Sequence, residues 1–139
     1  MGLLADIYIS RDEEAVAYDS NHSLPQSDRL QNTSITPLEL STLWAIMRGT
    51  PWEVSLMKEF QCLFQRDGGE RLIHRLPAAM IADLLKLAPD QMQAVASQWA
   101  ATDEMRWPAA NARRFLEDLS RLAHHAAESG RSVYLWNCV

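Results

Sequence analysis

The sequence has few basic residues and no long hydrophobic run, and each shortage excludes a class of protein. Its 13 Lys and Arg residues are outnumbered by 18 Asp and Glu residues, which gives a net charge of −5, whereas surfaces that bind nucleic acid are usually basic. The longest apolar runs, such as the one around Met80 to Leu87, fall far short of the roughly 18 residues that a membrane span needs. We therefore expect neither a nucleic-acid nor a membrane partner. We also expect a cytoplasmic location, because the first residues lack the basic and apolar regions of a secretion signal.

Cysteine and catalytic motifs are scarce as well. The two cysteines, Cys62 and Cys138, cannot form the multi-bridge framework of a small secreted domain, and their spacing matches no zinc pattern, so we expect free thiols. The chain has no nucleophile elbow, and its one Gly-Gly pair lacks the Lys and Ser/Thr of a phosphate-binding loop. The adjacent His124 and His125 cannot face one point on a helix. We therefore expect no metal, no cofactor and no catalytic residue.

The chain does have the length and composition of one globular domain, with 139 residues of which 47% are apolar. We therefore treat residues 1–139 as a single domain. Alternating apolar residues with β-branched and aromatic side chains predict strands at both ends of the sequence. An Asp-Gly-Gly turn between two further segments of this kind predicts a β-hairpin. The predicted strands comprise residues 3–10, 60–65, 71–76 and 132–139.

Helix starts are marked by proline at the first helical position, where its missing N–H costs no hydrogen bond, or by Ser or Thr followed three residues later by Glu. Residues 19–35 are polar with only scattered apolar side chains, so we expect a long loop there. These elements together predict an α+β fold that is mostly helical, with a small sheet formed by the terminal strands and the central hairpin and covered by a helical layer. Helices are predicted to begin after Ser10 and at Pro37, Pro51, Pro77, Pro89 and Pro108.

Polar residues on otherwise apolar strands are the candidates for a binding or catalytic site. Asp6 and Tyr8 share one face of the first strand, where a carboxylate can act as a base, hold a ligand or bond to a neighbouring loop. In the hairpin, His74 alternates with apolar residues and faces the predicted core, whereas Arg71 and Arg75 lie on the other face. An inward histidine is more often neutral and hydrogen-bonded than catalytic. If these five side chains converge at one edge of the sheet, they would bind an anionic ligand.

Tryptophan is abundant, with five residues in this short chain. Trp44, Trp99 and Trp136 fall at positions that the helix and strand patterns bury. Trp52 and Trp107 each adjoin a proline that opens a predicted helix. Each of these two either contacts a partner protein or ties down the start of its helix as a hydrophobic staple, and the staple is the commoner role.

Several short motifs occur in a fixed order from about Thr36 onward. They are the segment from Leu43 to Gly49, Arg71 and Leu72 before the helix at Pro77, the pair Trp107 and Pro108, and the segment from Ala126 to Gly130 before the last strand. In this order they resemble the YfbM-like proteins, a bacterial family with no established activity. That family tends to carry His-Phe where this chain has Trp44 and Ala45, so no role of such a histidine carries over. The resemblance implies an α+β fold and no particular function.

Two hypotheses for the function follow from the sequence. The first is a bacterial cytoplasmic interaction module that binds another protein without catalysis, for example an immunity protein that neutralises a basic toxin by charge complementarity. The alternative is a small anionic-ligand-binding protein or minor enzyme with a site around Asp6, His74 and the two arginines, Arg71 and Arg75. Convergence of Asp6 and His74 would distinguish the two. The predicted strands at both ends of the sequence leave the oligomeric state open. The protein could be a monomer, or a homodimer in which exposed terminal strands pair.

Overall fold

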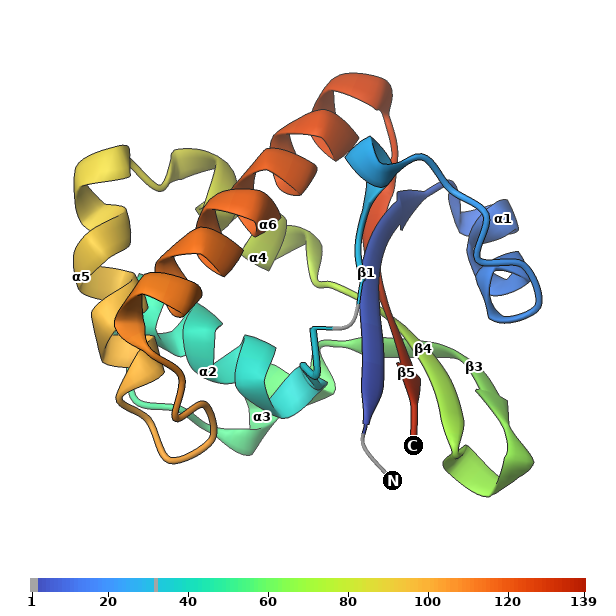
Figure 1. Ribbon diagram of the computed structural model, residues 1–139, viewed down its shortest axis with the longest axis horizontal. Helices are drawn as coiled ribbons and strands as arrows, with labels where there is room; N and C mark the ends of the chain where they lie inside the picture. The colour runs from blue at the N-terminus through green and yellow to red at the C-terminus, as the bar shows by residue number, and fades with distance from the viewer. Residues whose placement is uncertain (1–2, 32) are drawn as a thin grey trace.

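The computed structural model describes residues 3–31 and 33–139, so that Met1, Gly2 and Asn32, which lies in the expected long loop, fall outside the described residues. It shows an α+β fold in which an antiparallel sheet is covered on one face by helices (Figure 1). The strands are β1 (Leu4–Ser10), β2 (Arg29–Leu30), β3 (Gln61–Arg66), β4 (Arg71–Arg75) and β5 (Ser132–Cys138). The helices are α1 (Asp12–Ala15), α2 (Pro37–Arg48), α3 (Val54–Lys58), α4 (Ala78–Lys86), α5 (Pro89–Ala100) and α6 (Ala109–Ser129), and the 3₁₀ turns are η1 (Val16–Asp19), η2 (Gln26–Asp28) and η3 (Asp67–Gly69).

The first and last strands lie side by side at the centre of the sheet, whose order is β2-β1-β5-β4-β3. β1 and β5 pair along their whole length, from Leu4 opposite Cys138 to Ser10 opposite Ser132. The terminal strands and the central hairpin therefore form one sheet, as the sequence predicts. The short strand β2 and the turn η2 were not predicted, because the segment that contains them has too few apolar residues to show a periodic pattern.

The helical layer buries the main core against one face of the sheet (Figure 1). α6 contacts β1, β2 and β5, while α5 packs on α6 and on α2. Trp99 on α5 is fully buried, and its indole N–H donates a 2.9 Å hydrogen bond to the carbonyl of Glu39 on α2. Trp44 and Trp136 are buried as well, which confirms the prediction for these three tryptophans. The sheet supplies Ala5, Ile7, Ile9, Val133 and Leu135 to this core.

Some of the predicted helix starts are confirmed and others are wrong. At Thr36 the capping box is present, because the Glu39 carboxylate accepts a 2.8 Å hydrogen bond from the Thr36 backbone N–H. The similar sequence at Thr50 forms no such box, and α3 begins only at Val54. Likewise the hydroxyl of Ser10 donates to the carbonyl of Arg11 and does not cap α1. A helix that begins at a capping motif is stable in a protein mainly because it also buries an apolar face. α3 buries no residue, so the motif at Thr50 does not start a helix there.

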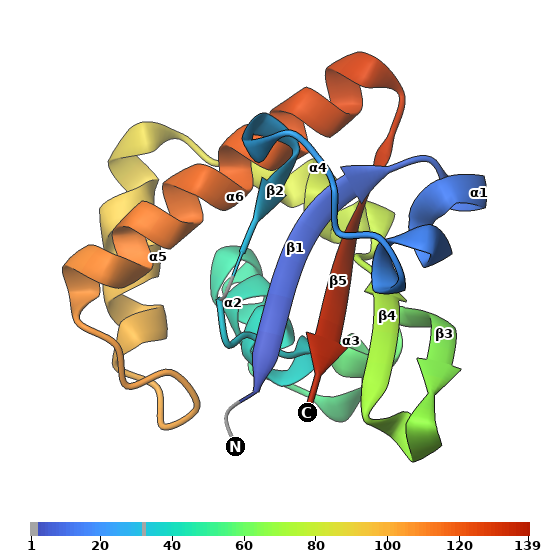
Figure 2. The same cartoon turned by 45° about the vertical axis from the view of Figure 1, so that its right-hand side comes forward.

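The second face of the sheet is covered by the chain that follows β1 (Figure 2). α1 contacts β1 and η1 contacts β4, so this short segment lies on the opposite side of the sheet from α5 and α6. We call residues 11–24 the cover segment. Of the helices in the described residues, none combines the length and the hydropathy that crossing a bilayer requires.

Candidate functional site

A cluster of aromatic side chains fills the space between the sheet and the cover segment. Tyr8 and Tyr134 are opposite each other on β1 and β5, with ring centroids 5.6 Å apart. Tyr18 from η1 stacks on Tyr8 at 4.1 Å, with an angle of 11° between the ring planes. The edge of Trp136 meets Tyr18 at 6.1 Å. This second core is built from aromatic rings, and each ring carries a polar group that needs a partner.

Hydrogen bonds to carboxylates and to one carbonyl satisfy these polar groups. The hydroxyl of Tyr18 donates to Asp6 at 2.7 Å, and the indole N–H of Trp136 donates to Asp19 at 2.9 Å. The hydroxyl of Tyr8 donates to the carbonyl of Ala15 at 2.7 Å. Three separate bonds thus tie the cover segment to the sheet, and both carboxylates are buried. Asp6 and Tyr8 act here as structural groups that position the cover segment.

The two candidate arginines on this face are paired with carboxylates. Arg71 lies 3.5 Å from an oxygen of Asp19 and 3.1 Å from an oxygen of Asp67. Arg75 donates a 3.0 Å hydrogen bond to Asp12, which also accepts a hydrogen bond from the hydroxyl of Tyr134. The positive charge that an anionic ligand would need is therefore neutralised within the protein. This arrangement disfavours the anionic-ligand hypothesis for these residues.

The tyrosines of the cluster keep their protons at neutral pH. Burial raises the pKa of Tyr8 and of Tyr18 far above the ordinary value, and the hydrogen bond to Asp6 raises the pKa of Tyr18 further. Burial and the neighbouring carboxylate of Asp12 raise the pKa of Tyr134 to about 12. A phenol with a raised pKa is a hydrogen-bond donor and a poor base or nucleophile. The cluster is therefore suited to binding and not to proton transfer.

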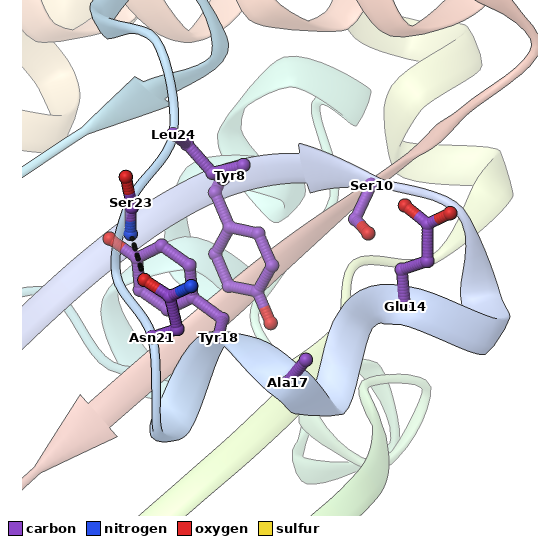
Figure 3. Close-up of a pocket in the computed structure, with 8 residues that line it drawn as sticks. All are labelled: Tyr8, Ser10, Glu14, Ala17, Tyr18, Asn21, Ser23 and Leu24. Carbon is purple, nitrogen blue, oxygen red and sulfur yellow. Dashed lines mark hydrogen bonds between the residues drawn. The ribbon is translucent and has the colours of Figure 1, made fainter.

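A cavity of about 260 Å³ opens beside this cluster, between β1 and the cover segment (Figure 3). Its apolar walls are the rings of Tyr8 and Tyr18 together with Leu24. Its polar groups come from Ser10 at the end of β1, from Glu14 on α1, and from Asn21 and Ser23 in the loop that follows η1.

His74 does not belong to this site, which corrects the predicted convergence. It lies opposite Leu135, which faces the helical core, whereas Asp6 lies opposite Trp136 on the other face. Alternation along a strand therefore separates His74 from Asp6 by the thickness of the sheet. Burial lowers the pKa of His74, and its Nδ1 atom is buried without a hydrogen-bond partner. Asp6, Tyr8, Arg71 and Arg75 do share one face, as the alternation predicts.

Trp52 and Trp107 lie in different environments. Trp52 is 40% exposed, and its indole N–H donates a 2.9 Å hydrogen bond to the hydroxyl of Ser41 on α2. Trp107 is half-buried, with its ring 6.1 Å from Trp99 and 5.7 Å from Phe115. It also lines an open groove of about 530 Å³ together with residues of α6 and of the segment around β2. Trp107 is thus joined to the aromatic core, while Trp52 keeps a large exposed area.

One polar cluster was not predicted from the sequence. Asp28 in η2 lies 3.0 Å from His125 on α6 and accepts a 3.0 Å hydrogen bond from Arg131. Burial opposes the charge of Asp28, but the hydrogen bonds and charges of Arg131 and His125 outweigh it and lower the pKa of Asp28. Residues this far apart in sequence give no local pattern, so the pairing could not be recognised in advance. The cluster fastens the predicted loop to the C-terminal end of α6.

The described residues offer few other groups that could bind a metal or react. Within residues 3–31 and 33–139, no three His, Cys, Asp or Glu side chains are grouped so that they could hold a metal ion. Cys62 is exposed and Cys138 is half-buried, and both are free thiols, as predicted. Comparison of the chain with protein-family models, with curated proteins and with solved structures finds no match in any of the three. The resemblance to the YfbM-like family therefore stays a prediction.

Proposed function

We propose that this protein is a non-catalytic interaction module of the bacterial cytoplasm that binds another protein through β3 and the residues that lead into it. The observation that carries the proposal is that β3 is an edge strand and that two exposed apolar side chains, Trp52 and Val54, lie in the segment before it. We call the exposed side chains and strand edge of residues 52–66 the β3 surface. The proposal concerns this surface and not the cavity on the second face of the sheet.

Exposed apolar side chains begin the β3 surface. Trp52 is 40% exposed and Val54 is 49% exposed, in a segment where every residue from Gly49 to Ser55 is exposed. Tryptophan is enriched among the residues that contribute most to protein–protein affinity. The hydrogen bond from Trp52 to Ser41 holds the indole in one orientation, which reduces the entropy that binding would cost. A fixed, exposed tryptophan of this kind is well suited to act as an anchor residue.

The edge of β3 supplies backbone groups for a partner to bind. β3 pairs only with β4 in the sheet order of the described residues (Figure 2), so its outer N–H and C=O groups face away from the sheet. The register shifts between Cys62 and Phe64, which marks a β-bulge. A bulge in an edge strand disfavours indiscriminate pairing between copies of a chain. This favours a specific partner over self-association.

The charge of the chain indicates the chemistry of the partner. With a net charge of −5, the protein attracts basic surfaces and repels acidic ones over a distance of several ångströms. The β3 surface itself carries two acidic and two basic side chains, so it is the net charge of the whole chain that supports the specific form of the proposal, an immunity protein that neutralises a basic toxin.

The test is affinity capture from a native bacterial lysate at low and at high salt, with bound proteins identified by mass. We expect a stoichiometric partner with a basic surface, whose retention decreases as salt screens the charges. Trp52→Ala and Val54→Ala should each reduce its retention. Ser41 still donates to the carbonyl of Leu38 when the indole is removed, so Trp52→Ala should fold normally.

A matched control comes from the cover segment. Val16 is 39% exposed, so Val16→Ala makes the same chemical change at a similar exposure but away from β3. We expect Val16→Ala to retain the partner as well as the original sequence does. Equal loss in the Val16→Ala and Val54→Ala variants, or no partner at either salt concentration, would contradict the proposal.

A further inference from the structure

We propose that the cavity between β1 and the cover segment binds the ammonium group of a small organic amine. This inference is independent of the proposed function, because the cavity and the β3 surface share no residue. The ligand class is a compact alkylammonium: one positive charge on a short apolar body. The argument rests on the charge, the oxygen atoms and the size of the cavity.

Glu14 supplies the negative charge among the residues that line the cavity, and Arg29, which interacts with the side chain of Tyr18, lies outside that lining. Glu14 is the one ionisable carboxylate among the described residues that line the cavity, and no Lys, Arg or His lines it (Figure 3). In the described part of the chain, the Glu14 side chain makes neither a hydrogen bond nor an ion pair, unlike Asp12, which is paired with Arg75. A carboxylate at the wall of a partly apolar cavity attracts a cation and repels an anion, although solvent at the exposed Glu14 weakens this attraction.

Oxygen atoms around the cavity add further acceptors for an ammonium group. The hydroxyl of Ser10 donates its proton to the carbonyl of Arg11, so its lone pairs remain free to accept. Asn21 orients its side-chain oxygen by accepting a 3.0 Å hydrogen bond from the Ser23 backbone N–H, and this oxygen can accept a second one. In Figure 3 the hydroxyl of Ser10 lies on the same side of Tyr8 as the carboxylate of Glu14, so these two groups can share one ammonium, whereas Asn21 and Ser23 lie on the other side of the ring and border the rest of the ligand.

The size and walls of the cavity restrict the body of the ligand. A volume of about 260 Å³ lies just below the range of roughly 300–1,000 Å³ that is usual for drug-sized ligands. Leu24, Ala17 and the rings of Tyr8 and Tyr18 supply apolar surface, which favours a short alkyl chain. A large nucleotide or a folded peptide segment would not fit inside.

The test is a titration followed by the amide resonances of Ala17, Asn21 and Ser23 in two-dimensional NMR spectra. The probes are isobutylammonium, isobutanol and isobutyrate, which share one apolar body and differ in charge. We expect saturable shifts with isobutylammonium, weaker ones with isobutanol and none with isobutyrate. Equal binding of isobutanol and isobutylammonium, tighter binding of isobutyrate, or no saturable shift with any probe would overturn the proposal.

Two variants and one control locate the site. Glu14→Gln removes the charge and should weaken isobutylammonium binding by about fivefold, the upper range for an exposed ion pair. Glu13 is also exposed, carries the same charge and does not line the cavity, so Glu13→Gln should leave the affinity unchanged. Ala17→Leu places a larger side chain in the cavity and should abolish binding. Equal weakening by Glu13→Gln and Glu14→Gln would overturn the assignment to this cavity.

The same ammonium chemistry could come from a free amine or from a lysine side chain of a protein. An additional titration with N-acetyl-lysinamide, which presents the ammonium group on a longer chain, distinguishes these sources. We expect it to bind more weakly than isobutylammonium, because the cavity is short. Tighter binding of the lysine derivative would overturn the assignment of a free amine as the ligand.

Discussion

The hydroxyl of Tyr18 donates a 2.7 Å hydrogen bond to the carboxylate of Asp6, and both side chains are buried. Asp6 is on the central strand β1, and Tyr18 is on the 3₁₀ turn η1 that covers it. This bond therefore joins the cover segment to the centre of the sheet. It also explains why a carboxylate stands on an otherwise apolar strand.

Replacing Tyr18 with Phe should show how much this bond contributes to stability. We expect Tyr18→Phe to lower the free energy of unfolding by about 1–2 kcal/mol, because a buried acceptor loses a donor. Tyr134→Phe removes a hydroxyl that bonds to Asp12, whose side chain is 57% exposed, so water can replace it and the loss should be smaller. Urea unfolding of both variants measures the difference, and equal losses would contradict this interpretation.

His74 should make the fold sensitive to mild acid. Burial lowers its pKa in the folded state below the ordinary value of 6.5, so its contribution to stability is complete above about pH 6.5 and is lost as the pH falls through the lower pKa of the folded state. His74→Leu removes this dependence and also the unpartnered Nδ1 atom. We expect the variant to be as stable as the original at pH 7 and more stable at pH 5 by urea unfolding. Parallel curves between pH 5 and 7 would contradict the prediction.

Below about pH 4, protonation of Asp28 should be the main cause of lost stability where η2 contacts α6. Burial opposes its charge, but Arg131 and His125 lower its pKa below the ordinary value of 3.8. Its contribution is therefore present above about pH 4 and is lost as the pH falls through the lower pKa of the folded state. We expect Asp28→Asn to be less stable at neutral pH and to lose less stability on acidification. Unfolding measured from pH 2.5 to 6 checks this, and an unchanged acid slope would disprove it.

Glycine at position 49 should contribute to stability only through the backbone conformation that it adopts. It ends α2 with a φ of +68°, and a Cβ added there would meet nothing within 4 Å. Gly49→Ala should therefore cost about 1–2 kcal/mol through conformational strain, since no steric clash adds to it. Gly49→Asn should cost less, because asparagine adopts this conformation more readily. Thermal unfolding of both variants tests the order, and equal costs would point to a different cause.

Local patterns in the sequence predicted the terminal strands, the hairpin and the helices that begin at Pro37, Pro77, Pro89 and Pro108. Each of these signals depends on neighbouring residues only, and each of the four helices also buries apolar side chains. The signal at Thr50 is chemically similar but is followed by an exposed segment. Tertiary burial and not the cap therefore decides where such a helix begins.

The candidate site was predicted only in part. Strand alternation placed Asp6 and Tyr8 on one face of their strand, but the predicted convergence of His74 with them is wrong, because His74 lies on the opposite face of the shared sheet. The role of the cover segment was missed because it buries Tyr18 and Asp19 through aromatic stacking and hydrogen bonds. Such contacts leave no periodic pattern of apolar residues.

The pairing of β1 with β5 has a consequence for how the protein is made. β1 precedes the other strands in the chain, yet its partner at the centre of the sheet, β5, ends only at Cys138. Until β5 has been synthesised and has left the ribosome, Ile7 and Ile9 have no strand beside them on that side. This long separation in sequence raises the entropic cost of the folding transition state. We therefore expect the sheet to assemble only once β5 has been made, and a nascent chain truncated before β5 to expose an apolar strand to chaperones.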